Sequence, residues 1–145
     1  MTCSLDANIL LYASSQDCPE HRVARPFLEK LLASQDLLCL SWATLSGYLR
    51  LVTNPAATAT PLTSDRATEN ISALLDRPRT RVLVEEPDFW ESFRGLMIQH
   101  RARGKLVPDV HLAALLRQHG VKTLYTHDRD FRRFDFLDVR DPLAT

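Results

Sequence analysis

The stretch TCSLDANILLYA (residues 2–13) decides the fold class of this chain. Residues 2–5 form a short run that suits a β-strand, and residues 7–13 have helical character. Asp6 lies at the junction of the two segments, where a carboxylate contributes nothing to a hydrophobic core. A strand that passes through an acid directly into a helix predicts a β-to-α turn in an α/β protein.

Strands and helices continue to alternate outward from this stretch. We predict further strands at residues 37–40, 81–84, 121–126 and 136–139. Helices are predicted at residues 19–34, 42–52, 65–75, 87–100 and 108–119, and one short turn at residues 130–134. The sequence also predicts where helices begin and end. We predict N-caps at Ser41 and Ser64, prolines at the first helical position at Pro87 and Pro108, and a helix C-terminus at Gly120. This alternation predicts a central parallel sheet in an α/β sandwich, formed by one domain over residues 1–145.

The composition narrows the classes of protein to which the chain can belong. Of its 145 residues, 45% are hydrophobic, which is typical of a globular protein. The formal net charge is +0, so the protein as a whole has no electrostatic attraction for nucleic acid or membranes. A polyanionic partner therefore requires a local basic patch or a bound metal.

Cysteine usage and hydropathy exclude two further classes. The three cysteines, Cys3, Cys18 and Cys39, are odd in number and include no C-x-x-C pair, so neither a disulfide framework nor a zinc site is predicted. Asp6 interrupts any apolar leader, and no apolar run approaches the roughly 18 residues of a membrane span. We therefore expect a cytoplasmic protein that makes no contact with a membrane.

Four acids stand where regular elements meet. Asp6 follows the first strand, Asp128 and Asp130 follow the strand that ends at Thr126, and Asp109 opens a helix. Because the carboxyl ends of parallel strands share one edge of the sheet, these carboxylates can converge although they are far apart in sequence. Crowded carboxylates repel one another, and a hard divalent cation such as Mg²⁺ or Mn²⁺ relieves that repulsion. The spacing thus predicts a metal site and leaves the reaction undetermined.

Each acid also has a plainer interpretation. Asp109 after Pro108 suits the first turn of any helix, where the helix dipole favours a negative charge. Asp128 and Asp130 suit an ordinary polar turn. Three neighbouring polar residues can orient a ligand, a water or the carboxylates themselves: Ser4, Asn8 and Thr126.

The segments that carry these acids resemble the motifs of PIN-domain ribonucleases, specifically toxins of the VapC type. The matching segments are LDANILLYA (5–13), residues 42–55 with YLRLVTNP, VPDVHLAA (107–114) and LYTHDRDFRRF (124–134). The resemblance implies a parallel sheet of five strands and an endoribonuclease that depends on Mg²⁺ or Mn²⁺. It also implies a homodimer that is neutralised by a cognate antitoxin. Asp6, Asp109 and Asp128 would be the catalytic metal ligands, with Asp130 as an accessory ligand or water positioner.

The chain departs from this family in its second motif. The family usually has a glutamate just before the aromatic-Leu-Arg segment, and here that position is Gly47. Glycine brings neither charge nor ligand, so either fewer acids suffice, another acid substitutes, or activity is weak. The possible substitutes are Glu85, Glu86 and Glu91, although acids near a helix start are usually only solvated.

RNA and a second copy of the chain would each need a surface. Basic residues that could contact phosphate are Arg50, Arg94, Arg101, Arg103, Lys105, Arg129, Arg132 and Arg133, of which the turn with Arg101, Arg103 and Lys105 is our first choice.

His111 and His127, beside two of the acids, form no recognised nucleophile–base pattern and are expected to be spectators or supporting residues. We expect pairing through apolar helical residues that exceed the needs of the core: Phe27, Leu31, Tyr48 and Leu51.

Two alternatives to the ribonuclease remain open. One is a catalytically weak or inactive PIN-fold protein that binds an antitoxin or RNA, which the glycine at position 47 favours. The other is a phosphoryl-transfer enzyme with Asp6 as nucleophile. Such enzymes usually have a second acid two positions further on, where this chain has Asn8.

Overall fold

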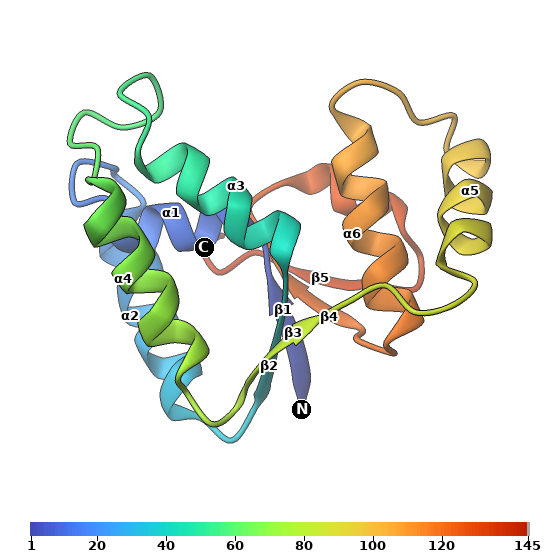
Figure 1. Cartoon of the computed structure of the whole chain (residues 1–145), viewed down its shortest axis with the longest axis horizontal. Helices are drawn as coiled ribbons and strands as arrows, with labels where there is room; N and C mark the ends of the chain where they lie inside the picture. The colour runs from blue at the N-terminus through green and yellow to red at the C-terminus, as the bar shows by residue number, and fades with distance from the viewer. Residues whose placement is uncertain (145) are drawn as a thin grey trace.

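The computed structural model describes residues 1–144 and is built on one parallel sheet of five strands (Figure 1). The strands are β1 (Thr2–Leu5), β2 (Leu37–Ser41), β3 (Thr80–Leu83), β4 (Thr123–Tyr125) and β5 (Asp138–Arg140). Their order across the sheet is β3-β2-β1-β4-β5, and every neighbouring pair is parallel. The predicted fold class is therefore confirmed.

Helices cover both faces of this sheet, four on one side and two on the other (Figure 1). The first group is α1 (Ala7–Ser14), α2 (His21–Ala33), α3 (Trp42–Val52) and α4 (Ser64–Leu75). The second group is α5 (Phe89–Gln99) and α6 (Leu106–Gln118), and the short 3₁₀ helix η1 (Arg129–Arg133) follows β4. None of the helices in residues 1–144 has the length and apolar composition needed to cross a membrane.

Strand β2 shows how a short apolar run serves two cores. Leu38 and Leu40 pack in the core beneath α1 to α4, while Cys39 packs in the core beneath α5 and α6. All three side chains are at most 3% exposed. Successive side chains of a strand point to opposite faces, so a strand that is covered on both faces is apolar throughout.

Three predicted helix starts are wrong by one or two residues. Thr63, rather than Ser64, caps α4, because its Oγ1 accepts a hydrogen bond from the Arg66 N–H at 3.2 Å. Helix α5 begins after Asp88, whose φ of 72° is incompatible with a right-handed helix, so Pro87 lies outside it. Helix α6 begins at Leu106 and includes Pro108 in its first turn. Backbone N–H groups in the first turn have no acceptor within the helix, so proline, which lacks an N–H, loses no helical hydrogen bond there.

The predicted end of α6 is confirmed in detail. Gly120 has a φ of 70°, its N–H donates to the carbonyl of Arg117 at 3.2 Å, and the Val121 N–H donates to Leu116 at 2.9 Å. These two bonds are those of a Schellman motif, which favours glycine because it needs the left-handed backbone region. The motif turns the chain from α6 toward β4.

The last two strands are shorter or shifted relative to the prediction. β4 includes only the middle of the predicted segment 121–126. β5 begins at Asp138, because the Leu137 N–H donates to the carbonyl of Phe134 and keeps the preceding residues in a turn. Phe136 packs against the core from this turn, so its apolar character does not indicate a strand.

The residues expected to pair two copies of the chain belong to the core. Tyr48 is 2% exposed and Leu31 is 9% exposed, and Phe27 and Leu51 pack against the same cluster. Helices α2 and α3 turn these side chains inward against α1 and the sheet, so this part of the prediction is wrong.

Candidate metal centre

Three of the four predicted acids converge at the carboxyl ends of the strands. Asp109, Asp128 and Asp130 each offer a carboxylate oxygen, and these oxygens lie within 4.8 Å of one another. Asp109 lies in the first turn of α6, Asp128 caps η1, and Asp130 lies in the first turn of η1. The beginnings of these two helices meet because α6 packs on the sheet and η1 follows β4.

Asp6 lies beside this group of three and is held by its own hydrogen bonds. Its Oδ1 accepts from the Ala7 N–H at 2.7 Å as the N-cap of α1, and its Oδ2 accepts from the Thr126 hydroxyl at 2.8 Å. Its backbone N–H donates to the carbonyl of Tyr125 at 3.0 Å, which extends the pairing of β1 with β4 to the site. The structure thus differs from the expected set: Asp130 is in the tight group, and Asp6 adjoins it.

Thr126 joins the two parts of the site. Its hydroxyl oxygen accepts a hydrogen bond from the Asp128 N–H at 3.0 Å while the same hydroxyl donates to Asp6. The side chain is 1% exposed, so water competes little for these bonds. The threonine therefore fixes the carboxylate of Asp6 and the backbone of Asp128 relative to each other, the supporting position expected from the sequence.

Two acids of the site have raised pKa values. The pKa of Asp109 is raised to about 7, first by burial and then by the negative charges of Asp128, Asp6 and Asp130, while the positive charge of Arg133 opposes the rise. Burial also raises the pKa of Asp6, although the hydrogen bonds from Thr126 and Ala7 lower it. The site therefore holds more negative charge than its surroundings neutralise.

Two further polar residues, Ser4 and Asn8, flank Asp6 along the chain. The Oγ of Ser4 and the Oδ1 of Asn8 are buried and have no hydrogen-bond partner among residues 1–144, so the expected hydrogen bond from Ser4 to a carboxylate is not formed. A buried oxygen without a partner is unfavourable by about 1–3 kcal/mol. The carboxylates of Asp109, Asp128 and Asp130 form an all-oxygen donor set, which fits a hard divalent cation with its bound waters.

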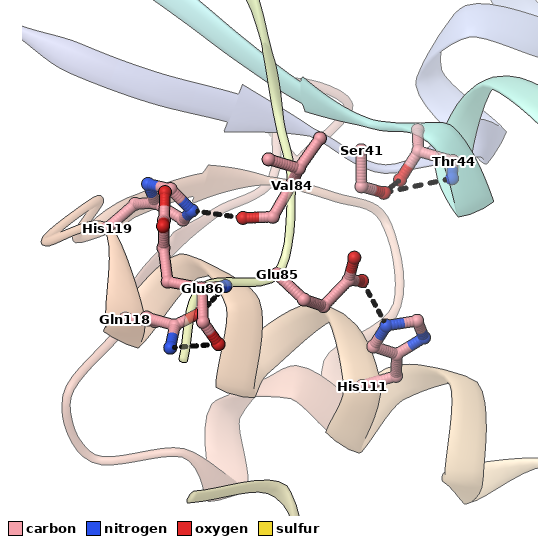
Figure 2. A network of polar contacts seen from close by, with 8 residues as sticks. All are labelled: Ser41, Thr44, Val84, Glu85, Glu86, His111, Gln118 and His119. Atoms are coloured by element: carbon pink, nitrogen blue, oxygen red, sulfur yellow. Dashed lines mark hydrogen bonds and ion pairs between the residues drawn. The ribbon is translucent and has the colours of Figure 1, made fainter. Parts of the chain in front are cut away.

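Glu85 does not belong to this group of acids. Figure 2 shows its carboxylate turned toward the ring of His111 on α6, and Oε1 lies 2.8 Å from Nε2 of that ring. The His111 ring stacks on the Phe93 ring, with 5.4 Å between the ring centroids. The hydrogen bond to His111 lowers the pKa of Glu85. Sequence reasoning missed this pair, since His111 was expected to be a spectator or a supporting residue.

The other two proposed substitutes are also placed away from a ligand role. Glu86 is exposed. Its backbone N–H donates a hydrogen bond to Gln118 Oε1 and its carbonyl accepts one from Gln118 Nε2, at the end of α6 (Figure 2). Glu91 is an exposed residue in the first turn of α5. Neither belongs to the group of Asp109, Asp128 and Asp130 whose carboxylate oxygens lie within 4.8 Å of one another.

Gly47 faces the beginning of α1. A Cβ atom built on Gly47 would lie 3.5 Å from the Cβ of Ala7, which is an ordinary van der Waals distance. A side chain at position 47 would thus start next to the residue that follows Asp6. The fold has no steric need for glycine here.

Basic side chains are exposed on two segments next to the acids. Arg101, Arg103 and Lys105 lie in the turn that leads into α6, in which Arg101 and Gly104 have φ values of 48° and 62°. On η1, directly after Asp128, the exposed basic residues are Arg129, Arg132 and Arg133. Both segments border the end of α6 that carries Asp109.

The raised pKa of Asp109 predicts a pH-dependent stability in the absence of divalent metal. A carboxyl group with a pKa of about 7 in the folded state and 3.8 in the unfolded state stabilises the fold below pH 3.8, and that contribution is lost as pH rises through about 7. We expect the Tm measured in EDTA to fall more steeply across this window for the wild type than for Asp109→Asn. Parallel Tm profiles of the two proteins would contradict the raised pKa.

Comparison with known proteins places the chain in one family. The model of the PIN domain family matches residues 4–137. Ribonuclease VapC48 of Mycobacterium tuberculosis is 40% identical over 144 residues, covering 99% of both chains. Ribonuclease VapC43 of the same organism is 35% identical over 143 residues, covering 99% of this chain and 96% of the relative.

Solved structures share the fold at lower sequence identity. The Mycobacterium tuberculosis toxin VapC20, described as cleaving the sarcin–ricin loop, has a TM-score of 0.70 at 18% identity and covers 95% of this chain and 98% of its own. A chain of VapBC2 from Rickettsia felis, bound to a promoter DNA fragment, has a TM-score of 0.68 at 17% identity. The match covers 97% of this chain and 98% of the VapBC2 chain. These structures match the five-stranded sheet and its flanking helices.

Proposed function

Because this chain belongs to the PIN-domain family of VapC ribonucleases, we propose that it is an endoribonuclease that acts as the toxin of a toxin–antitoxin pair. The observation that carries the proposal is the convergence of Asp109, Asp128 and Asp130 beside a hydrogen-bonded Asp6. A scaffold has no use for four neighbouring acids at one edge of the sheet, two of which have raised pKa values.

We propose Mg²⁺ or Mn²⁺ as the cofactor of this site. Asp109, Asp128 and Asp130 would hold the ion, with Asp6 as a further ligand on the side of α1. A bound divalent ion polarises a phosphodiester and lowers the pKa of a bound water. The protein contributes orientation, since Thr126 fixes Asp6 and the first turns of α6 and η1 fix the other acids. The backbone around Asp128 is further held by its Oδ1, which accepts from the Asp130 N–H at 2.9 Å.

Cleavage of purified RNA with added Mn²⁺ or Mg²⁺ tests this function directly. We expect the wild type to cleave single-stranded RNA and EDTA to stop the reaction. The competing hypothesis of a PIN-fold binding protein predicts RNA or antitoxin binding without cleavage at any metal concentration. The phosphoryl-transfer alternative predicts a covalent phosphate on Asp6, which mass spectrometry of the intact protein would detect.

The glycine at position 47 offers a gain-of-function test. We expect Gly47→Glu to tighten Mn²⁺ binding and to raise the cleavage rate by roughly 10-fold, because the new carboxylate starts beside Ala7 and can reach the side of the site that holds Asp6. The fold should tolerate it, since glutamate suits a helix better than glycine by roughly 0.5–1 kcal/mol.

Gly47→Gln is the matched control for this test. Glutamine has the same length and a similar helix propensity but no charge. Equal Mn²⁺ affinity and cleavage rate in wild type, Gly47→Glu and Gly47→Gln would show that this position is not a vacant ligand site.

We also propose two protein partners, a cognate antitoxin and a second copy of the chain. The large exposed apolar side chains on helices suggest α3 and α5 as the pairing surface: Trp42 is 56%, Trp90 64% and Ile98 61% exposed. Light scattering at micromolar concentration should give a dimer for the wild type and a monomer for Trp90→Glu.

Co-expression with an adjacent small reading frame should yield a complex that has lost RNA cleavage.

A further inference from the structure

The acids create a charge problem for an RNA substrate. Asp6, Asp109, Asp128 and Asp130 lie together, and one divalent cation neutralises only two of their four charges. A phosphodiester adds another negative charge when it enters the site. If the proposed ribonuclease function is correct, a cation of the protein must therefore stand beside the acids and offset this repulsion.

Arg133 is placed to be that cation. In a 3₁₀ helix, residues three apart lie above one another, so Arg133 is on the same side of η1 as Asp130. Its Nε donates to the backbone carbonyl of Asp130 at 3.1 Å. Phe131 and Phe134, each 1% exposed, anchor this turn in the core. The guanidinium group is thus tethered next to an acid of the site rather than free in solvent.

The remaining donors of Arg133 are uncommitted. Within residues 1–144 its Nη1 and Nη2 take part in no recorded hydrogen bond, and the side chain forms no ion pair within 4.0 Å. A held guanidinium with two free amino groups is the geometry with which arginine binds phosphate oxygens in pairs.

We propose that Arg133 binds the non-bridging oxygens of the RNA phosphate that enters the acid cluster, through its two Nη groups. The inference rests on the proposed ribonuclease function. It adds a substrate-binding role for a residue on η1, next to the turn with Arg101, Arg103 and Lys105 that the sequence favoured for RNA contact.

Arg133→Gln tests the inference, with Arg132→Gln as the matched control. Both variants remove one exposed charge from the same turn, and the Arg132 side chain forms no hydrogen bond or ion pair within residues 1–144. We expect Arg133→Gln to lower kcat/KM for a mixed-sequence single-stranded RNA by roughly 10- to 100-fold, and Arg132→Gln by less than about threefold. Arg133→Lys should recover only part of the loss, because it restores the charge without the paired donors.

Two readouts other than cleavage complete the experiment. Fluorescence anisotropy of the same RNA with Ca²⁺ in place of Mn²⁺ should show weaker binding for Arg133→Gln, with a salt slope reduced by about 0.7 for one lost phosphate contact on a single strand. Mn²⁺ affinity should not fall, since the substitution removes a positive charge from beside the acids.

The outcomes separate the inference from the function on which it rests. Equal effects of Arg133→Gln and Arg132→Gln on cleavage and binding in an active wild type would overturn the assignment of Arg133. Loss of Mn²⁺ binding in Arg133→Gln would also overturn it, by showing that Arg133 acts through the acids rather than on the RNA. A wild type that binds RNA through Arg133 but never cleaves it would refute the ribonuclease function and leave the phosphate contact standing.

Discussion

Replacing Asp109 with Asn should lower RNA cleavage by on the order of 1,000-fold while the protein stays folded. The amide keeps the shape of the side chain but loses the charge that would hold a divalent cation between Asp109, Asp128 and Asp130. Metal-assisted stabilisation of the reaction is worth several kcal/mol, and each 1.4 kcal/mol is a factor of ten in rate. Initial rates with Mn²⁺ and a calorimetric Mn²⁺ titration measure the two effects.

The fold of Asp109→Asn should be at least as stable as the wild type in EDTA. The substitution removes a carboxylate that burial and three neighbouring acids disfavour. Asp135→Asn is the control, because it removes an exposed carboxylate just beyond η1 that does not belong to the group of Asp109, Asp128 and Asp130. Wild-type cleavage by Asp109→Asn, with EDTA still abolishing the activity, would show that the metal is held elsewhere.

The second large effect is expected at Asp6. We expect Asp6→Asn to lower cleavage by on the order of 100-fold or more, because this acid adjoins the other three and its charge contributes to the electrostatics of the site. The new amide oxygen can still accept from the Ala7 N–H, so α1 keeps its cap and the Tm should change little.

Thr126→Val separates the charge of Asp6 from its orientation. Valine has nearly the shape of threonine but cannot bond to Asp6 Oδ2 or to the Asp128 N–H. Residues that orient metal ligands typically change activity by 10–100-fold, so cleavage should fall by about 10-fold, less than in Asp6→Asn. A larger loss in Thr126→Val than in Asp6→Asn would mean that the hydroxyl itself, rather than the carboxylate, is needed for the reaction.

The supporting roles of Ser4 and Asn8 remain predictions, but their burial sharpens them. Both carry a buried oxygen without a partner in residues 1–144, and they flank Asp6 on either side along the chain. Local sequence could indicate that polar residues surround the acid. It could not indicate that these particular oxygens would be shielded from bulk water, because burial depends on the packing of segments that are distant in sequence.

The sequence by itself determined the fold class and the edge of the sheet at which the acids lie. Short apolar strands, helical periods and the Gly120 stop are local signals, because they depend on hydrogen bonds and side-chain contacts within a few residues. Once all strands are parallel, residues such as Asp6 and Asp128 that follow strands must lie at one edge. This is why the fold class was predicted correctly and why the acids could be named.

Only the tertiary structure decided which acids approach one another and which side chains are already engaged. Asp109 and Asp130 belong to the tight group, while Asp6 is bonded to Thr126, which is 120 residues away in sequence. Glu85 is paired with His111, and Tyr48 is core rather than surface. Each of these outcomes depends on how separate helices pack on the sheet and on side-chain torsions. A periodic pattern in one segment carries no information about a distance to another.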